Sequence, residues 1–200
     1  MSNNVQLNVT AGPMQGKNFV FEELAAFTLQ EGEKLIEKTI GKTEKKIVEE
    51  IVSYSHGMPV LIKAISSRYK ETKNVKKAYL IELCLKNSVS HMYLDSVLND
   101  FLYKARGEAM PKTLVKVLAF MKHARLTEIA KRLYRSAPVT KSILGRMMLV
   151  DMIVKTGNTY EFSSLAMKDW LKLMFSGFEF EEVPSDEILK QAEEVLDEQQ

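Results

Sequence analysis

Cysteine, tryptophan, histidine and long apolar runs are scarce in this 200-residue chain, and each scarcity excludes something. The single cysteine, Cys84, has no partner for an internal disulfide and lies in the apolar run 78–85, so we expect a small buried side chain. No apolar run approaches the roughly 18 residues of a membrane-spanning helix. The first residues, Met1 to Asn4, lack the basic and apolar regions of a signal peptide. We therefore expect a cytoplasmic protein that makes no contact with a membrane.

The three histidines do not indicate catalysis or a metal site. His56, His91 and His123 fall on different predicted helices, and none has a second His or Cys at metal-ligand spacing. We expect each to lie at a helix end or on the surface. Because no Ser/His/Asp set can be assembled from the spacing either, the sequence predicts a chain that is not an enzyme and holds no cofactor.

Two segments resemble phosphate-binding loops without meeting their requirements. Residues 12–18 bring their glycines one residue too close together and lack the hydroxyl that binds magnesium. Residues 40–43 end in Gly-Lys-Thr, but Ile36 replaces the first glycine and the segment joins two predicted helices without a preceding strand. Neither is expected to bind a nucleotide by itself.

Charge is distributed unevenly, although the net charge is only +2. Residues 179–198 hold nine acidic residues against one basic residue, whereas residues 112–172 hold twelve basic residues against four acidic ones. Such asymmetry suggests a body that faces a polyanion and an acidic appendage. The alternative interpretation is that the lysines are merely solvated, as on many helical proteins.

The pattern predicts a mainly α-helical protein. Residues 1–27 are expected to be extended, and residues 28–106 to form a bundle of helices with short connections. Thr28 with Glu31 forms a capping-box pattern, and Thr43, Asn74, Ser88 or Ser90 are expected to cap later helices. Gly57 is predicted to end one helix, and Pro59 to lie in the first turn of the next.

A change of rhythm follows Gly107 and Pro111, and residues 107–178 are predicted to form a winged-helix (helix-turn-helix) domain. Helices are expected over 112–123, 126–133 and 139–150, followed by strands over 152–156 and 159–162 with a two-residue Gly157-Asn158 turn. Ser163 or Ser164 is expected to cap one more helix. Residues 179–200 are predicted to form an acidic helix whose apolar stripe docks on its own protein or, in a second interpretation, on a partner or another copy of the chain.

Double-stranded DNA is the favoured partner of this domain. In a helix-turn-helix the third helix lies in the major groove, and neighbouring basic or polar side chains contact phosphates. The expected inward face is Val139, Ile143, Met147 and Val150. The predicted DNA-binding residues are Lys131, Arg132, Arg135, Thr140, Lys141, Ser142, Arg146, Lys155, Asn158 and Thr159.

One feature of the third helix argues against a base-reading role. Leu144 and Met148 are expected to face outward, where a protein interface is more usual than DNA. A protein–protein interaction or homo-oligomerisation module, built from the winged helix and the acidic helix, is therefore the alternative.

Several motifs resemble the C-terminal region of archaeal AAA+ and related signalling ATPases. Residues 21–24 with 28–32 resemble the approach to the helical lid of these proteins, and residues 55–62 resemble the Gly-x-Pro-x-x-Leu motif of that lid, here at Gly57 and Pro59. Tyr160-Glu161-Phe162 and Trp170-Leu171 are similar to the pattern at the end of the archaeal winged helix. The resemblance implies a helical lid, a winged helix and a regulatory or DNA-binding role, as in transcription regulation. The nucleotide-binding core of the family is absent from this chain, which puts adenine contact in doubt.

Overall fold

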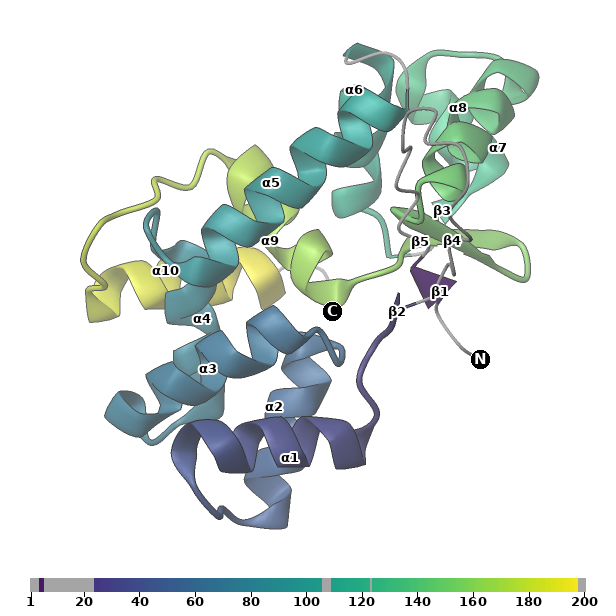
Figure 1. Ribbon diagram of the computed structural model, residues 1–200. Helices are drawn as coiled ribbons and strands as arrows, with labels where there is room; N and C mark the ends of the chain where they lie inside the picture. Colours follow the sequence, from purple (N-terminus) through teal and green to yellow (C-terminus); the bar gives the residue numbers. More distant parts are fainter. Residues whose placement is uncertain (1–3, 6–23, 106–108, 123, 198–200) are drawn as a thin grey trace, which may run out of the picture.

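The computed structural model describes residues 4–5, 24–105, 109–122 and 124–197 and is mainly helical (Figure 1). Two short strands, β1 (Asn4–Val5) and β2 (Leu24–Ala25), pair in antiparallel fashion in the segment that was expected to be extended. The first phosphate-loop lookalike, residues 12–18, lies outside the described residues, as do most of the 21–24 motif and His123.

Five helices follow: α1 (Leu29–Ile40), α2 (Lys45–Ser55), α3 (Pro59–Thr72), α4 (Val75–Cys84) and α5 (Val89–Lys104). Most of their boundaries follow the local sequence signals. The capping box of Thr28 and Glu31 is present, and the side chains of Asn74 and Ser88 cap α4 and α5. The expected cap at Thr43 is wrong, because α2 begins one residue later, after Glu44, which makes no side-chain cap.

The next elements include both helices and strands: α6 (Ala109–Ala119), β3 (Ala124–Arg125), α7 (Leu126–Leu133), α8 (Ala137–Leu149), β4 (Ile153–Thr156) and β5 (Thr159–Phe162). The three strands form one antiparallel sheet in the order β3-β5-β4, with β5 in the middle. Between β4 and β5, Gly157 has a φ of 60°. A positive φ at the first central residue alone is what a type II′ hairpin turn requires, so the expected hairpin is confirmed.

The chain ends its described part with α9 (Leu165–Ser176), capped by Ser164, and α10 (Asp186–Asp197). Helix α9 packs against α2, α4, α5, α6 and β5, and so lies between the first five helices and the small sheet (Figure 1). Helix α10 packs on α4 and α9. Its apolar residues Ile188, Leu189 and Ala192 are buried there, so the stripe docks on its own protein.

Helix α8 buries a face that overlaps the expected one at Ile143 and Met147 but is rotated from it. Thr140, Ile143, Leu144 and Met147 are buried, whereas Val139 is 46% exposed. Leu144 is completely buried and Met148 packs against the core, so the prediction that both face outward is wrong. Helix α8 itself carries seven apolar residues, which are spread almost all the way around its axis. Packing against neighbouring elements therefore decides which of several possible apolar faces is buried.

Candidate functional site

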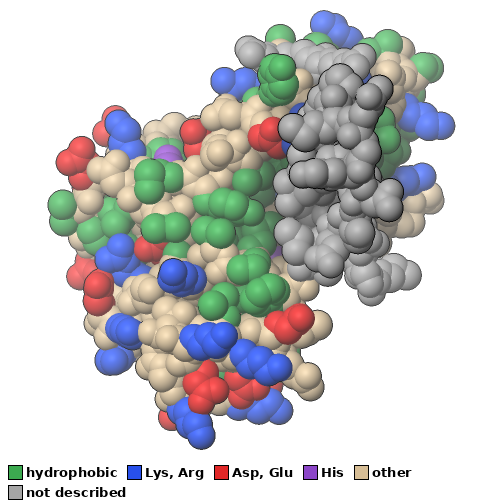
Figure 2. Space-filling view, viewed as in Figure 1, with side chains coloured by type: hydrophobic (Ala, Val, Ile, Leu, Met, Phe, Trp, Pro, Cys, Tyr) green, Lys and Arg blue, Asp and Glu red, His purple; other side chains and the backbone are tan. Residues whose placement is uncertain are grey.

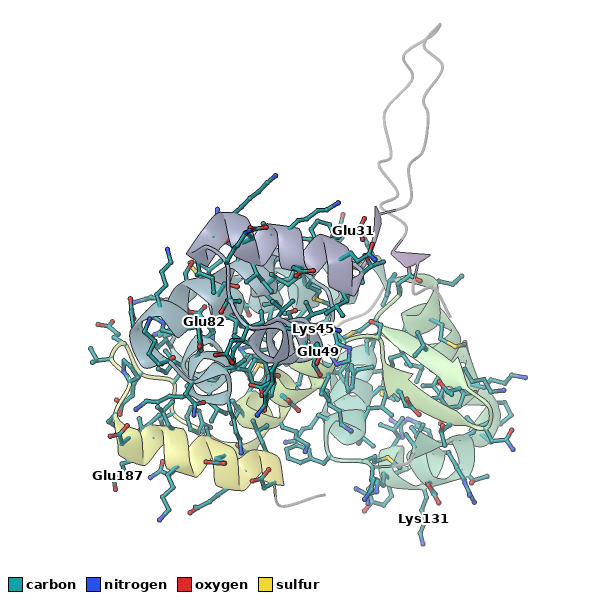
Figure 3. The ribbon with its side chains drawn as sticks, turned by 90° about the horizontal axis from the view of Figure 1, so that it is seen from below. Glu31, Lys45, Glu49, Glu82, Lys131 and Glu187 are labelled. Carbon is teal, nitrogen blue, oxygen red and sulfur yellow. The ribbon has the colours of Figure 1, made fainter. Side chains whose placement is uncertain are left out.

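Exposed basic side chains gather around α7, α8 and the β4–β5 hairpin. Lys131 and Arg132 lie in the last turn of α7, Arg135 follows it, Lys141 lies in the first half of α8, and Lys155 is on β4. All five are exposed. In Figure 3 the side chain of Lys131 points away from the ribbon, and in Figure 2 blue side chains mark the outer edge of this part of the molecule.

These five side chains are not neutralised by neighbouring carboxylates. Within the described residues, none of them lies within 4.0 Å of an acidic group. The Nζ atom of Lys155 instead lies 5.9 Å from the ring centroid of Tyr160, and Nη1 of Arg135 donates to the carbonyl oxygen of Tyr134 at 3.1 Å. The surface therefore offers positive charge to a negatively charged ligand.

The three polar residues that were expected beside these basic residues differ in their exposure. Ser142 is exposed on α8, and Asn158 is exposed at the hairpin turn. Thr159 is half-buried, and its hydroxyl donates to the carbonyl oxygen of Thr156 at 2.9 Å. The hydroxyl of Thr159 therefore helps to hold the turn.

Two of the expected DNA-binding residues point inward. Thr140 is completely buried, and its Oγ1 has no hydrogen-bond partner among the described residues. Arg146 is half-buried, and its Nη1 donates to the carbonyl oxygen of Ala105 at 3.2 Å, which ties α8 to the end of α5. Both corrections have the same cause, the rotated packing of α8 about its own axis.

An exposed aromatic residue was missed in the sequence. Tyr134 is 88% exposed, has a φ of 52° and lies just after α7, two residues beyond Arg132. With Phe120 and Lys122 these residues border a groove of about 740 Å³ beside α7. An aromatic residue interleaved with bases is the signal that could have identified it, because such combinations are common where proteins contact nucleic acids.

Gly57 and Pro59 have structural roles. Pro59 is the first residue of α3, and Gly57 has a φ of 71° in the connection from α2. The carbonyl oxygen of Gly57 accepts a hydrogen bond from the backbone N–H of Phe27 at 2.8 Å, and a Cβ at Gly57 would collide with the Phe27 backbone. This glycine therefore holds the segment before α1 against the start of α3.

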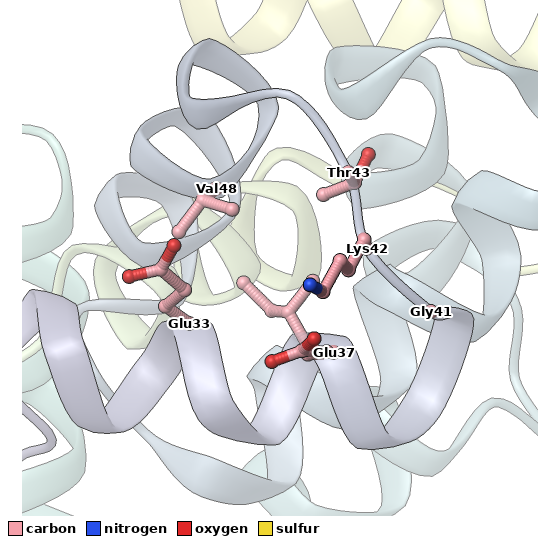
Figure 4. A pocket seen from close by; sticks show the side chains of 7 residues that line it. Glu33, Glu37, Gly41, Lys42, Thr43 and Val48 are labelled. Atoms are coloured by element: carbon pink, nitrogen blue, oxygen red, sulfur yellow. The ribbon is translucent and has the colours of Figure 1, made fainter.

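The second phosphate-loop lookalike borders a small pocket of about 390 Å³ (Figure 4). Gly41 caps the end of α1, so the segment joins two helices as expected and no strand precedes it. The carboxylates of Glu33 and Glu37 line the same pocket. Because these negative charges would repel a phosphate, the pocket does not favour a nucleotide.

His91 lies in the first turn of α5, at a helix end as expected, and its ring is half-buried. Its Nδ1 accepts a hydrogen bond from the indole N–H of Trp170 at 3.0 Å, and its ring packs edge-on against Trp170 and Phe180. Burial lowers the pKa of His91, while a hydrogen bond with the Leu83 backbone acts in the opposite direction. Over the described ranges, no three His, Cys, Asp or Glu side chains form a group that could hold a metal ion.

The buried cysteine behaves as predicted. Cys84 is completely buried, and burial raises the pKa of its thiol to about 12. Its thiol is therefore protonated at neutral pH and unreactive.

Comparisons with known proteins identify no relative of this chain. No family model, no curated protein and no solved structure matches this chain. Among the helices of the described residues, none combines the length and the apolar character needed to cross a membrane.

Proposed function

We propose that residues 109–178 form a winged-helix domain that binds double-stranded DNA without catalysing a reaction. Helix α8 would lie in the major groove, and the β4–β5 hairpin would be the wing. The observation that carries the proposal is the set of five exposed, unneutralised basic side chains on α7, α8 and the wing.

The order of elements supports this assignment. A helix, a short strand, two helices and a hairpin that pairs with the short strand follow one another in the sequence. In such an arrangement the second and third helices form the helix-turn-helix. Strand β3 fits this order even though the sequence pattern did not predict it.

The burial of Leu144 removes the main argument against DNA. Lys141 and Ser142 are the exposed residues near the start of α8, where a recognition helix meets base edges. Arg132, Arg135 and Lys155 are placed to contact the phosphates on either side. Thr140 and Arg146 are left out of the proposed interface because they face the core.

A protein-facing role is the second candidate, and one observation favours it. Leu149 at the end of α8 is 81% exposed and Tyr103 on α5 is 84% exposed. The apolar stripe of α10 no longer contributes, since α4 and α9 already cover it. If this function is correct, Leu149→Asp will abolish a dimer or complex detected by sedimentation equilibrium and leave DNA binding unchanged.

The resemblance to the lid and winged helix of archaeal AAA+ ATPases remains a prediction. We infer that the helical part, residues 28–106, serves as a lid-like scaffold, in which Gly57 and Pro59 act through the chain geometry described above. A calorimetric titration with ATP is expected to give no heat of binding, and a clear binding curve would restore a nucleotide-dependent function.

The DNA proposal is tested by fluorescence anisotropy with a labelled duplex at several salt concentrations. Lys141→Glu with Lys155→Glu should weaken binding by at least about tenfold, and the dependence of log K on log salt should become shallower by about two. The matched control is Lys38→Glu with Lys63→Glu, which makes the same change of charge at exposed positions on α1 and α3. Equal affinities of the two double variants would overturn the proposed interface.

A further inference from the structure

A cavity of about 590 Å³ lies among α2, α4, α9 and α10, beside Lys122 in the segment that follows α6. Its walls combine apolar surface from Tyr54, Leu80 and Leu165 with an unusual number of charged groups. The charged lining residues are Lys76, Lys122, Lys168, Asp169, Lys172 and Asp197. The volume of this cavity falls within the range of small-molecule sites.

Two of these lysines, Lys168 and Lys172, stand one turn apart on the same face of α9. Lys172 is only 7% exposed, and its Nζ donates to the carbonyl oxygen of Leu196 at 3.2 Å. The Nζ of the half-buried Lys168 donates to the carbonyl oxygen of Met121 at 3.1 Å. An ammonium group has three N–H donors, so each lysine keeps donors for a further acceptor.

Neither lysine is paired with a carboxylate. No acidic oxygen of the described residues lies within 4.0 Å of either Nζ. The pKa of Lys168 is lowered first by burial and then by the positive charge of Lys172. Two positive charges are thus held near each other, partly out of water, without direct neutralisation.

Two acids, Asp169 and Asp197, line the same cavity. Asp169 accepts a hydrogen bond from the hydroxyl of the buried Tyr79 at 2.9 Å, and burial raises the pKa of its carboxyl group. Lys76 is paired with Glu193 of α10, while Asp197 is exposed at the end of that helix. The α9 lysine pair therefore shares the cavity with two carboxylates, but neither lysine is in direct contact with one of them.

We propose that this cavity binds a small organic phosphate, with the phosphate group held by Lys168 and Lys172. A phosphate dianion supplies the two negative charges and several acceptor oxygens that this lysine pair lacks. The organic part of the ligand lies against Tyr54, Leu80 and Leu165. The inference does not rest on DNA binding, because Lys168 and Lys172 lie on α9, outside the α7–α8 surface, and a cavity of this size cannot admit a duplex.

Calorimetric titration of the full chain with phenyl phosphate, in chloride buffer of constant ionic strength, tests the site. We expect saturable binding by the unaltered chain and at least about tenfold weaker binding by Lys168→Gln and by Lys172→Gln. Lys112→Gln, which removes an exposed charge on α6, should bind like the unaltered chain. Inorganic phosphate should bind more weakly than phenyl phosphate, because it leaves the apolar wall uncovered; equal or tighter binding of inorganic phosphate would overturn the organic part of the assignment.

Further variants keep the outcome decisive. If Lys172→Gln does not fold, the less buried Lys168 decides: Lys168→Arg should retain binding that Lys168→Gln loses. Lys141→Glu with Lys155→Glu should still bind phenyl phosphate, which separates this site from the proposed DNA interface. The proposal is overturned by the absence of heat with the unaltered chain, by unchanged affinity in Lys168→Gln, or by loss of binding in the Lys141/Lys155 variant.

Discussion

The first five helices and the part from α6 to β5 use their charges differently. Every ion pair found between described residues has at least one partner in α2, α3, α4 or α5. Four exposed basic residues on α7, α8 and β4, in contrast, lie in no such pair: Lys131, Arg132, Lys141 and Lys155. In the first part the charges serve the fold, and in the second they remain available to a ligand.

The clearest example of the first use is Glu82 on α4. Its side chain is buried, and Oε1 accepts from Nε and Nη2 of Arg68 on α3 at 3.3 Å. Its Oε2 accepts from the hydroxyl of Ser90 on α5 at 3.1 Å. One carboxylate therefore joins three helices, and Figure 3 shows it inside the helical part while Lys131 points into solvent.

Removing Glu82 should have the largest effect on stability. Glu82→Ala removes the acceptor of the Arg68 Nε and Nη2 and of the Ser90 hydroxyl in a partly buried place, although Nη1 of Arg68 keeps its pair with Glu71. We expect a loss of about 3 kcal/mol in the free energy of unfolding. Urea denaturation measures it. Lys45→Ala, which breaks the exposed pair with Glu49, is the control and should cost less than about 0.5 kcal/mol. Similar losses in both variants would contradict a structural role specific to the buried network.

Gly57 and Gly157, which both have a positive φ, compare the two parts of the molecule through backbone conformation alone. Gly57→Ala combines the cost of the left-handed conformation with a collision with the Phe27 backbone, so we expect a loss of about 2 kcal/mol. Gly157→Ala meets nothing within 4 Å and should lose only about 1 kcal/mol. Thermal unfolding followed by circular dichroism compares them, and a larger loss at Gly157 would show that the hairpin is the more constrained turn.

The buried Thr140 tests which face of α8 packs against the core. Because its buried hydroxyl lacks a partner among the described residues, Thr140→Val should raise stability by about 1 kcal/mol. The same variant should leave DNA affinity unchanged, unlike Lys141→Glu one residue later. Loss of DNA binding in a stably folded Thr140→Val protein would return this residue to the interface.

His91 predicts the smallest effect, a dependence of stability on pH. Its pKa is lowered in the folded chain by burial, so the folded state favours the neutral ring. The contribution of the neutral His91 ring to the stability of the folded chain is complete above the pKa of about 6.5 that the ring has in the unfolded chain. This contribution is lost as the pH falls through that value toward the lower pKa of the folded chain. Urea midpoints between pH 7.5 and 5.5 should therefore fall more steeply for the unaltered chain than for His91→Gln. Parallel curves would show that His91 does not contribute.

Much of the secondary structure follows from local signals in the sequence. The caps at Thr28, Asn74 and Ser88 each act between residues three apart, and the Gly157 turn needs only its own φ. These interactions form within one turn of chain, so a single sequence carries them. The basic character of the α7–α8 surface can also be predicted from composition, because lysine and arginine side chains are rarely fully buried in proteins.

The parts that failed depend on what packs against what. Strand β3 has only two residues, too few for any periodicity, and exists because β5 lies beside it. Thr140 and Leu144 turn inward because α8 is apolar almost all round and its neighbours select the face. The cavity beside Lys168 and Lys172 joins residues that are up to 143 positions apart in the chain, Tyr54 and Asp197 among them.

The sequence by itself determined where most of the helices begin, where the hairpin turns and where positive charge is concentrated. The tertiary structure decided which side chains that charge can offer to a ligand. Packing sets the rotation of α8 about its axis, so that Arg146 donates a hydrogen bond to the carbonyl oxygen of Ala105 and Lys141 remains exposed. The physical reason is range: caps and turns are satisfied by neighbours in the chain, whereas burial depends on contacts between distant elements that no local pattern specifies.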